Sequence, residues 1–262
     1  MKATTNPFPL QDRIASIFLH VSDLRRAAEW YSELLGMPLY DERLNGGPVY
    51  WFDLPGTGLI LDNNENNRKD PNWREDMKPL IMFACDDIDE AYAYVKGKAE
   101  PIHEPNRHPG MAYFNFRSPD GRAYMACWAE DGGQEFEPFK GASPIIPRIG
   151  GVFVNVRDMK SAAAWISDLL GMPLREEETD DSIYVLPTSR GAHILLDDNR
   201  YRRGETYEIP FMFDTDDIEA SYVYAAQHGM SIFHDIERHG GVAYFTLTDP
   251  DGNLVMVCQE EE

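Results

Sequence analysis

The sequence predicts an α+β fold built from four β-α-β-β-β modules in two tandem halves. The length of 262 residues suits two domains of roughly 130 residues each. The chain also carries the same hairpin pattern twice, at residues 110–127 and 240–258. Each copy has a β-rich run, a Pro-Asp-Gly turn and a second β-rich run, which indicates two antiparallel strands. An internal repeat of this length is stronger evidence than local propensity, so the halves are expected to share one architecture.

The first module begins with a strand expected at residues 14–21, which are rich in β-formers. A helix should follow with Asp23 as its N-cap, because apolar residues recur after it at helical spacing. Gly36 supplies a left-handed residue at the helix end, and Pro38 prevents continuation. Three short strands are then expected around residues 38–41, 49–54 and 58–62, separated by Asn, Gly and Pro turns.

The second module repeats this order after a polar loop at residues 63–78. A strand is expected at 80–85, and Asp86 and Asp87 should cap a helix that ends at Gly97. Three more strands would run to Trp128. We therefore expect a first domain at residues 13–128, a linker rich in Gly and Pro at 129–147, and a second domain at 148–259.

The charge of the chain excludes some partners. With 24 basic and 45 acidic residues the formal net charge is −21, whereas nucleic acids and anionic membranes need a basic surface. A cationic ligand is compatible with this charge, although an acidic surface also serves solubility alone. The three cysteines lack C-x-x-C spacing, and neither a signal peptide nor a membrane span is apparent. A cytoplasmic protein with reduced thiols is expected.

Two motifs resemble the vicinal oxygen chelate superfamily, which includes glyoxalase I, bleomycin-resistance proteins and extradiol dioxygenases. The first is V-x-D-(L/M)-x-x-A-A-x-(W/Y)…L-L-G-M-P-L at residues 21–39 and 156–174, and the second is (S/D)-P-D-G-x-x-x-M at 118–125 and 249–256. The resemblance implies that paired modules curve a mixed sheet into a cup, with the helices outside. It specifies the fold rather than the reaction, since the family supports many chemistries.

The resemblance also implies where metal ligands would stand, usually a His on the first strand and a Glu four residues after the Gly of the turn. The corresponding residues in the two halves are Ser16 and Gly151, Leu61 and Leu196, Leu80 and Pro210, and Met125 and Met256. Divalent metals on this scaffold need imidazole and carboxylate ligands. Neither half has them, so no metal and no other cofactor is expected.

The chain therefore resembles the metal-free, bleomycin-resistance-like members of the family. We expect a protein that binds and sequesters a partly aromatic small molecule. The alternative is a glyoxalase- or dioxygenase-like enzyme with a relocated metal site, and a third possibility is a scaffold whose cups are filled by its own side chains. The family allows module pairing within or between halves, so a monomer or a homodimer is expected.

Strand alternation predicts which side chains face into the cups. The expected ligand-binding residues are Phe18, His20, Tyr113, Met125 and His108 in the first half, and Phe153, Asn155, Tyr244, Met256 and His239 in the second. Aromatic and sulfur-containing side chains suit a partly aromatic ligand, although they could also simply fill a closed cup. Cys127 and Cys258 are expected to be apolar fillers, because no basic neighbour is evident.

The histidines leave alternatives open. His20 could be hydrogen-bonded at the edge of the sheet rather than catalytic. Both halves carry an Arg-His pair, which ends in His108 or His239, with another His five residues earlier. These loops could orient a ligand, act as an acid–base pair or merely fix a turn. Three of the first-half histidines (His20, His103 and His108) could also supply a zinc site if they converged.

Overall fold

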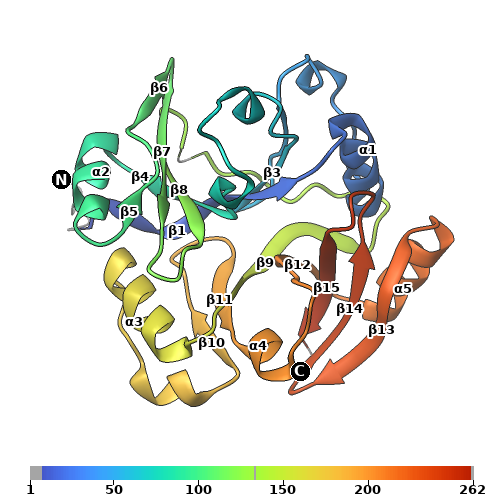
Figure 1. The fold of residues 1–262 in the computed structure, drawn as a ribbon. Helices are drawn as coiled ribbons and strands as arrows, with labels where there is room; N and C mark the ends of the chain where they lie inside the picture. Colours follow the sequence, from blue (N-terminus) through green and yellow to red (C-terminus); the bar gives the residue numbers. More distant parts are fainter. Residues whose placement is uncertain (1–7, 133, 261–262) are drawn as a thin grey trace, which may run out of the picture.

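The computed structural model describes residues 8–132 and 134–260, and it forms two curved mixed β-sheets with helices on their outer faces (Figure 1). The first sheet has the order β2-β3-β1-β4-β8-β7-β5, with β6 beside β7. Its strands are β1 (Leu10–His20), β2 (Val49–Phe52), β3 (Gly58–Asp62), β4 (Ile81–Cys85), β5 (Glu100–Pro101), β6 (Asn106–His108), β7 (Met111–Arg117) and β8 (Ala123–Ala129).

The second sheet repeats this topology with the order β10-β11-β9-β12-β15-β14-β13. Its strands are β9 (Ile145–Asn155), β10 (Ile183–Leu186), β11 (His193–Asp197), β12 (Phe211–Thr215), β13 (Ser231–His239), β14 (Val242–Thr248) and β15 (Leu254–Glu260). The helices are α1 (Leu24–Leu35), α2 (Ile88–Lys96), α3 (Met159–Leu170), α4 (Asn199–Arg203) and α5 (Ile218–Gln227). Each sheet uses strands of one half only, so the modules pair within a half.

The predicted helix ends are confirmed. The Asp23 carboxylate accepts a hydrogen bond from the Arg26 amide at 3.1 Å, and Gly36 adopts a φ of 62° after the last turn. Asp87 caps α2 in the same way. None of the helices within residues 8–132 and 134–260 is long and apolar enough to cross a membrane.

The strand predicted at residues 38–41 was wrong. That segment leads into a 3₁₀-helix at Asp41–Arg43, and the Tyr40 amide donates to the Tyr50 hydroxyl at 3.1 Å instead of to a strand. The second half does the same, because the Arg175 amide donates to the Tyr184 hydroxyl at 3.0 Å. The first sheet extends to Ala129 and the second starts at Ile145, so the connection between them is residues 130–144.

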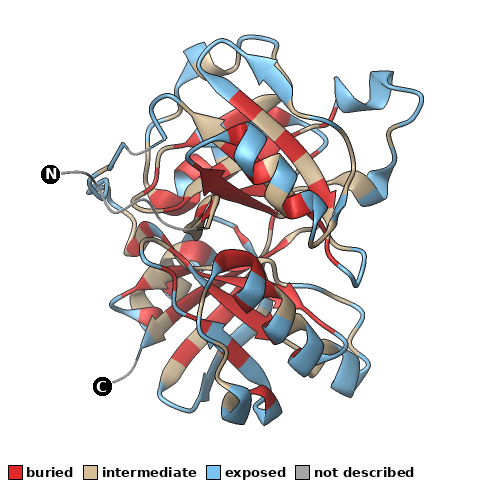
Figure 2. Ribbon diagram, turned by 90° about the vertical axis from the view of Figure 1, so that its left-hand side faces the viewer, coloured by how far each residue is buried: buried red, intermediate tan, exposed pale blue. Residues whose placement is uncertain are grey.

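Strand alternation separates the core from the cups. On β1, Ile17 and Leu19 belong to the main buried cluster, whereas Phe18 belongs to a smaller cluster with Met82 and Cys127 on the opposite face. Figure 2 shows the buried residues concentrated in the sheets and along the inward faces of the helices. The concave faces of the sheets are thus separate from the main core, as the period of two predicts.

Each half places its hairpin turn, residues 118–122 or 249–253, against the other half. The Arg122 guanidinium donates to the Asn155 carbonyl at 2.9 Å, and the Asn253 side chain donates to the His20 carbonyl at 3.2 Å. The Tyr31 hydroxyl, fully buried on α1, donates to the Asp249 carboxylate at 3.2 Å. Charge-assisted hydrogen bonds in buried positions are stronger than neutral exposed ones, so these contacts fix the second half against the first.

We predict that Tyr31→Phe lowers the free energy of unfolding by about 1.5–3 kcal/mol, because it removes a buried hydrogen bond to a charged group. Urea denaturation measures the change. Tyr50→Phe is a matched control within one half, since its hydroxyl accepts only from a main-chain amide among its described partners and should cost less. Equal stability of Tyr31→Phe and wild type would contradict the role of this contact.

Candidate functional site

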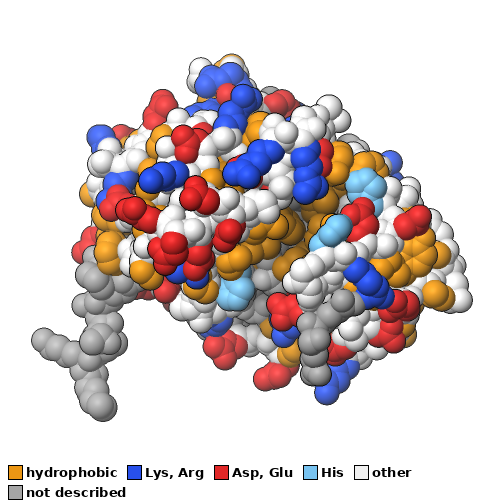
Figure 3. Space-filling model, turned by 90° about the horizontal axis from the view of Figure 1, so that it is seen from below, with side chains coloured by type: hydrophobic (Ala, Val, Ile, Leu, Met, Phe, Trp, Pro, Cys, Tyr) orange, Lys and Arg blue, Asp and Glu red, His pale blue; other side chains and the backbone are white. Residues whose placement is uncertain are grey.

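The concave face of the second sheet holds a cavity of about 1810 Å³. Its floor is formed by Phe153, Leu195, Met212, Tyr244, Met256 and Cys258, which come from five adjacent strands. Seen from below, hydrophobic side chains line a hollow in the surface and histidines lie near its edge (Figure 3). We call this cavity the second cup.

The strand register explains the floor. Gly151 pairs with Met212, and Met212 pairs with Met256, so these three residues lie side by side. A Cβ atom on Gly151 would lie 2.7 Å from Leu195 Cδ1 and 2.9 Å from Met212 Cε. Glycine therefore lets the apolar side chains close over β9, and an imidazole at this position would collide with them.

Four of the positions assigned from the resemblance were wrong. The residues that pair with Ser16 and Gly151 are Met82 and Met212, two positions after the expected Leu80 and Pro210. Leu61 and Leu196 belong to the main core, and their neighbours Ile60 and Leu195 face the cups instead. The shift is one residue, which reverses the face in a strand. The correction does not add a metal ligand, because the aliphatic side chains of Ile60 and Leu195 replace those of Leu61 and Leu196.

The residues of the floor do not fit the family's divalent metal. Gly151, Leu195, Met212 and Met256 supply no imidazole or carboxylate. Within the described part of the chain, no group of three or more His, Cys, Asp or Glu residues is arranged to hold a metal ion.

The first half has the same floor. Phe18, Ile60, Tyr113, Met82, Met125 and Cys127 form one cluster, and they match Phe153, Leu195, Tyr244, Met212, Met256 and Cys258 in turn. The predicted cup residues Phe18, Tyr113 and Met125 therefore lie together, as do Phe153, Tyr244 and Met256. The sequence reasoning missed Met82 and Met212, although their repeat at matched positions could have revealed them.

Two residues that line the second cup, Thr246 and Arg190, each have a buried polar atom without a partner in the described part of the chain, and the Thr246 atom lies on the sheet itself. Thr246 lies opposite Met256 in the β14–β15 ladder, lines the cavity and is 0% exposed. Its hydroxyl oxygen is buried and makes no hydrogen bond to a described residue. The matched Asn115 likewise has a buried side-chain oxygen without such a partner. An unpaired buried polar atom costs free energy, so its presence in both cups needs an explanation.

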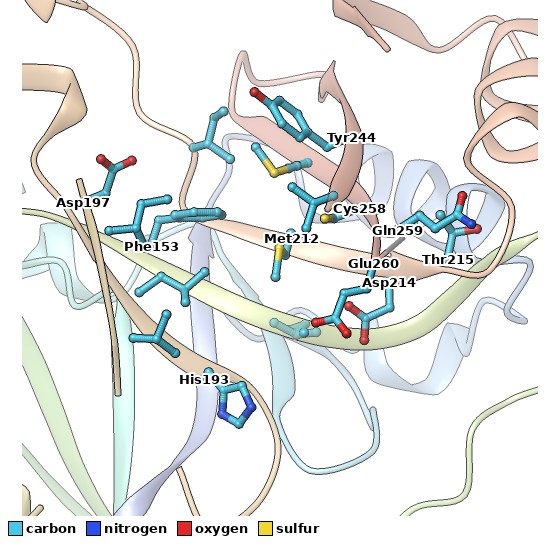
Figure 4. A pocket seen from close by; sticks show the side chains of 18 of the residues that line it. Phe153, His193, Asp197, Met212, Asp214, Thr215, Tyr244, Cys258, Gln259 and Glu260 are labelled. Atoms are coloured by element: carbon cyan, nitrogen blue, oxygen red, sulfur yellow. The ribbon is translucent and has the colours of Figure 1, made fainter. Parts of the chain in front are cut away.

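The two ends of the second cup are acidic. Figure 4 shows Asp214 beside Glu260 at one end, Asp197 at the other, and Met212, Phe153 and Cys258 between them. Burial raises the pKa of Asp214 and Asp197, and Arg148 opposes this shift at Asp214 through a 2.6 Å ion pair. A Cβ on Gly150 would lie 2.0 Å from Asp214 Oδ1, so glycine makes room for this carboxylate.

The cysteines of the cups are not poised as nucleophiles. Burial raises the pKa of Cys127 and of Cys258 to about 11, and Asp214 and Glu260 add to the shift at Cys258. A nucleophilic cysteine needs a lowered pKa. Both thiols therefore act as apolar floor groups, which agrees with the expectation from the sequence.

His20 is held in one neutral tautomer. Its Nδ1 accepts from the Asn64 side-chain amide at 2.9 Å, so its protonated Nε2 donates to the Pro79 carbonyl at 3.0 Å. Burial lowers the pKa of His20 to about 4. With both nitrogens engaged, His20 has no free position for a metal or a substrate proton.

The remaining histidines do not converge on His20. His103 accepts from the Asn115 amide at 3.1 Å and is bonded to the Glu104 carbonyl, which fixes the loop before β6. His108 is exposed on β6 and stacks on Tyr113 with ring centroids 5.9 Å apart. His239 lines the second cup and lies 3.6 Å from Glu237, whose carboxylate also accepts from the Tyr244 hydroxyl. Asn155 does not line the second cup but a separate cavity between the halves.

We predict a specific pH dependence from His20. Its pKa is about 4 in the folded chain and ordinarily near 6.5, so the unfolded state binds the proton more tightly. Its contribution to stability is therefore complete above pH 6.5 and is lost as the pH falls to 4, by about 3 kcal/mol. Asn is the residue at the matched position 155, so His20→Asn should flatten the unfolding free energy over this range.

Urea denaturation between pH 4 and 7 measures the difference, and His108→Asn on the exposed strand is the control. An unchanged slope in His20→Asn would contradict the buried neutral state.

Comparisons with known proteins agree with this architecture. The family model described as "Glyoxalase/Bleomycin resistance protein/Dioxygenase superfamily" matches residues 13–124 and 148–257. The uncharacterized protein YetH of Bacillus subtilis (strain 168) is 23% identical over 114 residues, which are 43% of this chain and 95% of YetH.

Two solved structures share the fold at low identity. The Mn(II)-bound glyoxalase from Novosphingobium aromaticivorans superposes with a TM-score of 0.62 at 16% identity, covering 97% of this chain and 83% of the glyoxalase. A catechol 2,3-dioxygenase superposes with a TM-score of 0.57 at 12% identity, covering 95% of this chain and 89% of the dioxygenase. The chain thus belongs to the glyoxalase/bleomycin resistance protein/dioxygenase superfamily, with one domain of that family in each half.

Proposed function

We propose that the second cup binds a partly aromatic, cationic small molecule without a metal and sequesters it. The apolar floor between two acidic ends carries this proposal, and the buried, unpartnered hydroxyl of Thr246 on the cup wall supports it. A side chain that only filled a closed core would pair its hydroxyl or be apolar. A ligand that accepts this hydrogen bond would remove the cost of leaving it unmade.

The floor of the cup indicates the apolar part of the ligand. Phe153 and Tyr244 provide flat surfaces, and Met212 and Met256 provide polarisable, adaptable ones. Small-molecule sites are typically apolar with a few placed polar groups. At about 1810 Å³ the open cup exceeds the usual range of roughly 300–1,000 Å³, so a ligand with two or three fused rings fits without displacing protein.

The charges around the cup indicate a positive ligand. Seven carboxylates and three guanidiniums line it, and the three guanidiniums are paired with Asp214, Glu135 and Glu205, which leaves four carboxylates in excess. The seven acidic residues are Glu135, Asp197, Glu205, Asp214, Asp216, Glu237 and Glu260. A cleft with an excess of one sign of charge attracts ligands of the opposite sign and speeds their association. The acidic charge is thus present at the site and not only over the chain as a whole.

The absence of metal ligands at the floor supports binding rather than metal-assisted chemistry. The family members named above as glyoxalase and dioxygenase are enzymes, and the first is described with Mn(II). In this chain the equivalent floor positions carry Gly, Leu and Met, which cannot hold such an ion through nitrogen or oxygen.

We predict that 10-methylacridinium binds more tightly than acridine, and that acridine-9-carboxylate binds most weakly, because the ends of the cup are acidic. Fluorescence titration measures the three dissociation constants. Met256→Ala should weaken 10-methylacridinium binding about tenfold by removing a floor contact, in line with roughly 1–2 kcal/mol for buried apolar surface.

The internal repeat provides the matched control. Met125→Ala removes the same side chain from the first half and should leave binding in the second cup unchanged. Thr246→Val should weaken acridine, whose ring nitrogen accepts a hydrogen bond, by about 2–12-fold but leave 10-methylacridinium nearly unaffected. Tighter binding of the carboxylate, or equal effects of Met125→Ala and Met256→Ala, would contradict the proposal.

A further inference from the structure

A second cavity, of about 470 Å³, lies where the two halves meet. We call it the junction cavity, and its polar lining comprises His20, Lys78, Arg122, Asn155, Thr206, Tyr207, Glu208 and Asn253. It contains matched residues of the repeat. His20 and Asn155 end the first strand of each half, and Arg122 and Asn253 end the two hairpin turns.

The matched residues His20 and Asn155 differ in their side-chain hydrogen bonds. His20 uses both ring nitrogens within its own half. Asn155 is 6% exposed, and no hydrogen bond joins its side-chain amide to any residue in the described ranges. The amide atoms of Asn155 are not among the fully enclosed side-chain atoms, so the carboxamide lines the junction cavity with its donors unused. The second half thus presents an unpartnered amide at the position where the first half has a fully bonded imidazole.

Arg122 supplies a second unused donor. Its Nη2 donates to the Asn155 carbonyl at 2.9 Å and lies 3.9 Å from Glu208, whose carboxylate is already paired with Arg200. Its Nε is buried and has no partner among the described residues. The guanidinium is therefore held in place through Nη2, while its Nε–H lacks an acceptor at the edge of the junction cavity.

We propose that the junction cavity binds the carboxylate of a small organic acid, with Arg122 Nε and Asn155 Nδ2 as donors. A guanidinium presents its N–H groups in a plane that matches a carboxylate. Lys78, whose ammonium is paired with Glu75, adds positive charge to the lining, whereas neutral His20 adds none. The lining thus holds two cations and one carboxylate, Glu208, which is paired with Arg200, so the junction cavity is less acidic than a chain of net charge −21 as a whole.

The junction cavity is distinct from the second cup in both place and charge. Phe153 and Tyr207 line both cavities, so these two rings form the wall between them. The carboxylate site does not require a ligand in the cup, and it can be tested separately from the proposed function.

Chemical-shift titration of the ¹⁵N-labelled full chain tests the site directly. Sodium acetate and sodium phosphate are added at constant ionic strength, and the side-chain signals of Arg122 Nε and Asn155 Nδ2 are followed. We expect saturable shifts of both signals with acetate and weaker or no shifts with phosphate, which is larger and tetrahedral.

Asn155→Asp keeps the size of the side chain and replaces a donor with a negative charge, so it should weaken acetate binding at least tenfold. Asn66→Asp adds the same charge in an exposed loop and should stay within twofold of wild type. The acetate titration of the wild-type chain tests the site even if Asn155→Asp fails to fold. Absence of saturable shifts, a response to phosphate alone, or wild-type acetate affinity in a folded Asn155→Asp would overturn the proposal.

Discussion

The structure depends on the way each half uses its hairpin turn to bind the other half. The turn side chains Arg122 and Asn253 donate to the carbonyls that end β9 and β1, and Tyr31 reaches Asp249 from α1. Because the turn also sets the register of the last two strands, the contact links the shape of each cup to the position of its neighbour. The residues of the two turn-to-carbonyl contacts, Arg122 with Asn155 and Asn253 with His20, all line the junction cavity.

Much of the fold could be predicted because local signals agreed with the repeat. Asp23 and Gly36 mark a helix start and end that hold in the structure, and the repeat reproduced them in the second half. The strand at residues 38–41 failed because a tertiary contact, the Tyr50 hydroxyl, satisfies the Tyr40 amide. The inner faces of β3 and β11 were assigned wrongly by one residue, at Leu61 and Leu196. Both strands have consecutive aliphatic residues, so their sequences do not show which face is buried.

The candidate site was likewise predictable from the sequence only in part. Phe153, Tyr244 and Met256 could be placed from alternation alone, whereas the pairing of Met212 with Gly151 required the sheet order. The unpartnered Thr246 hydroxyl and the ion pair of Asp214 with Arg148 depend on contacts between distant strands. Asn155 was expected to face a cup because the parity of β9 is right, but it lies at the end of the strand, beyond the cup floor.

Loss of the family's ligand residues in both halves makes one claim central, that binding in the second cup needs no metal. Elemental analysis by mass spectrometry, on protein purified without chelators and then titrated with 10-methylacridinium before and after dialysis against EDTA, tests it most directly. The floor of Gly151, Leu195, Met212 and Met256 predicts far less than one divalent metal per chain and an unchanged dissociation constant after EDTA. One Mn, Fe, Ni or Zn ion per chain, with loss of binding when it is removed, would contradict it.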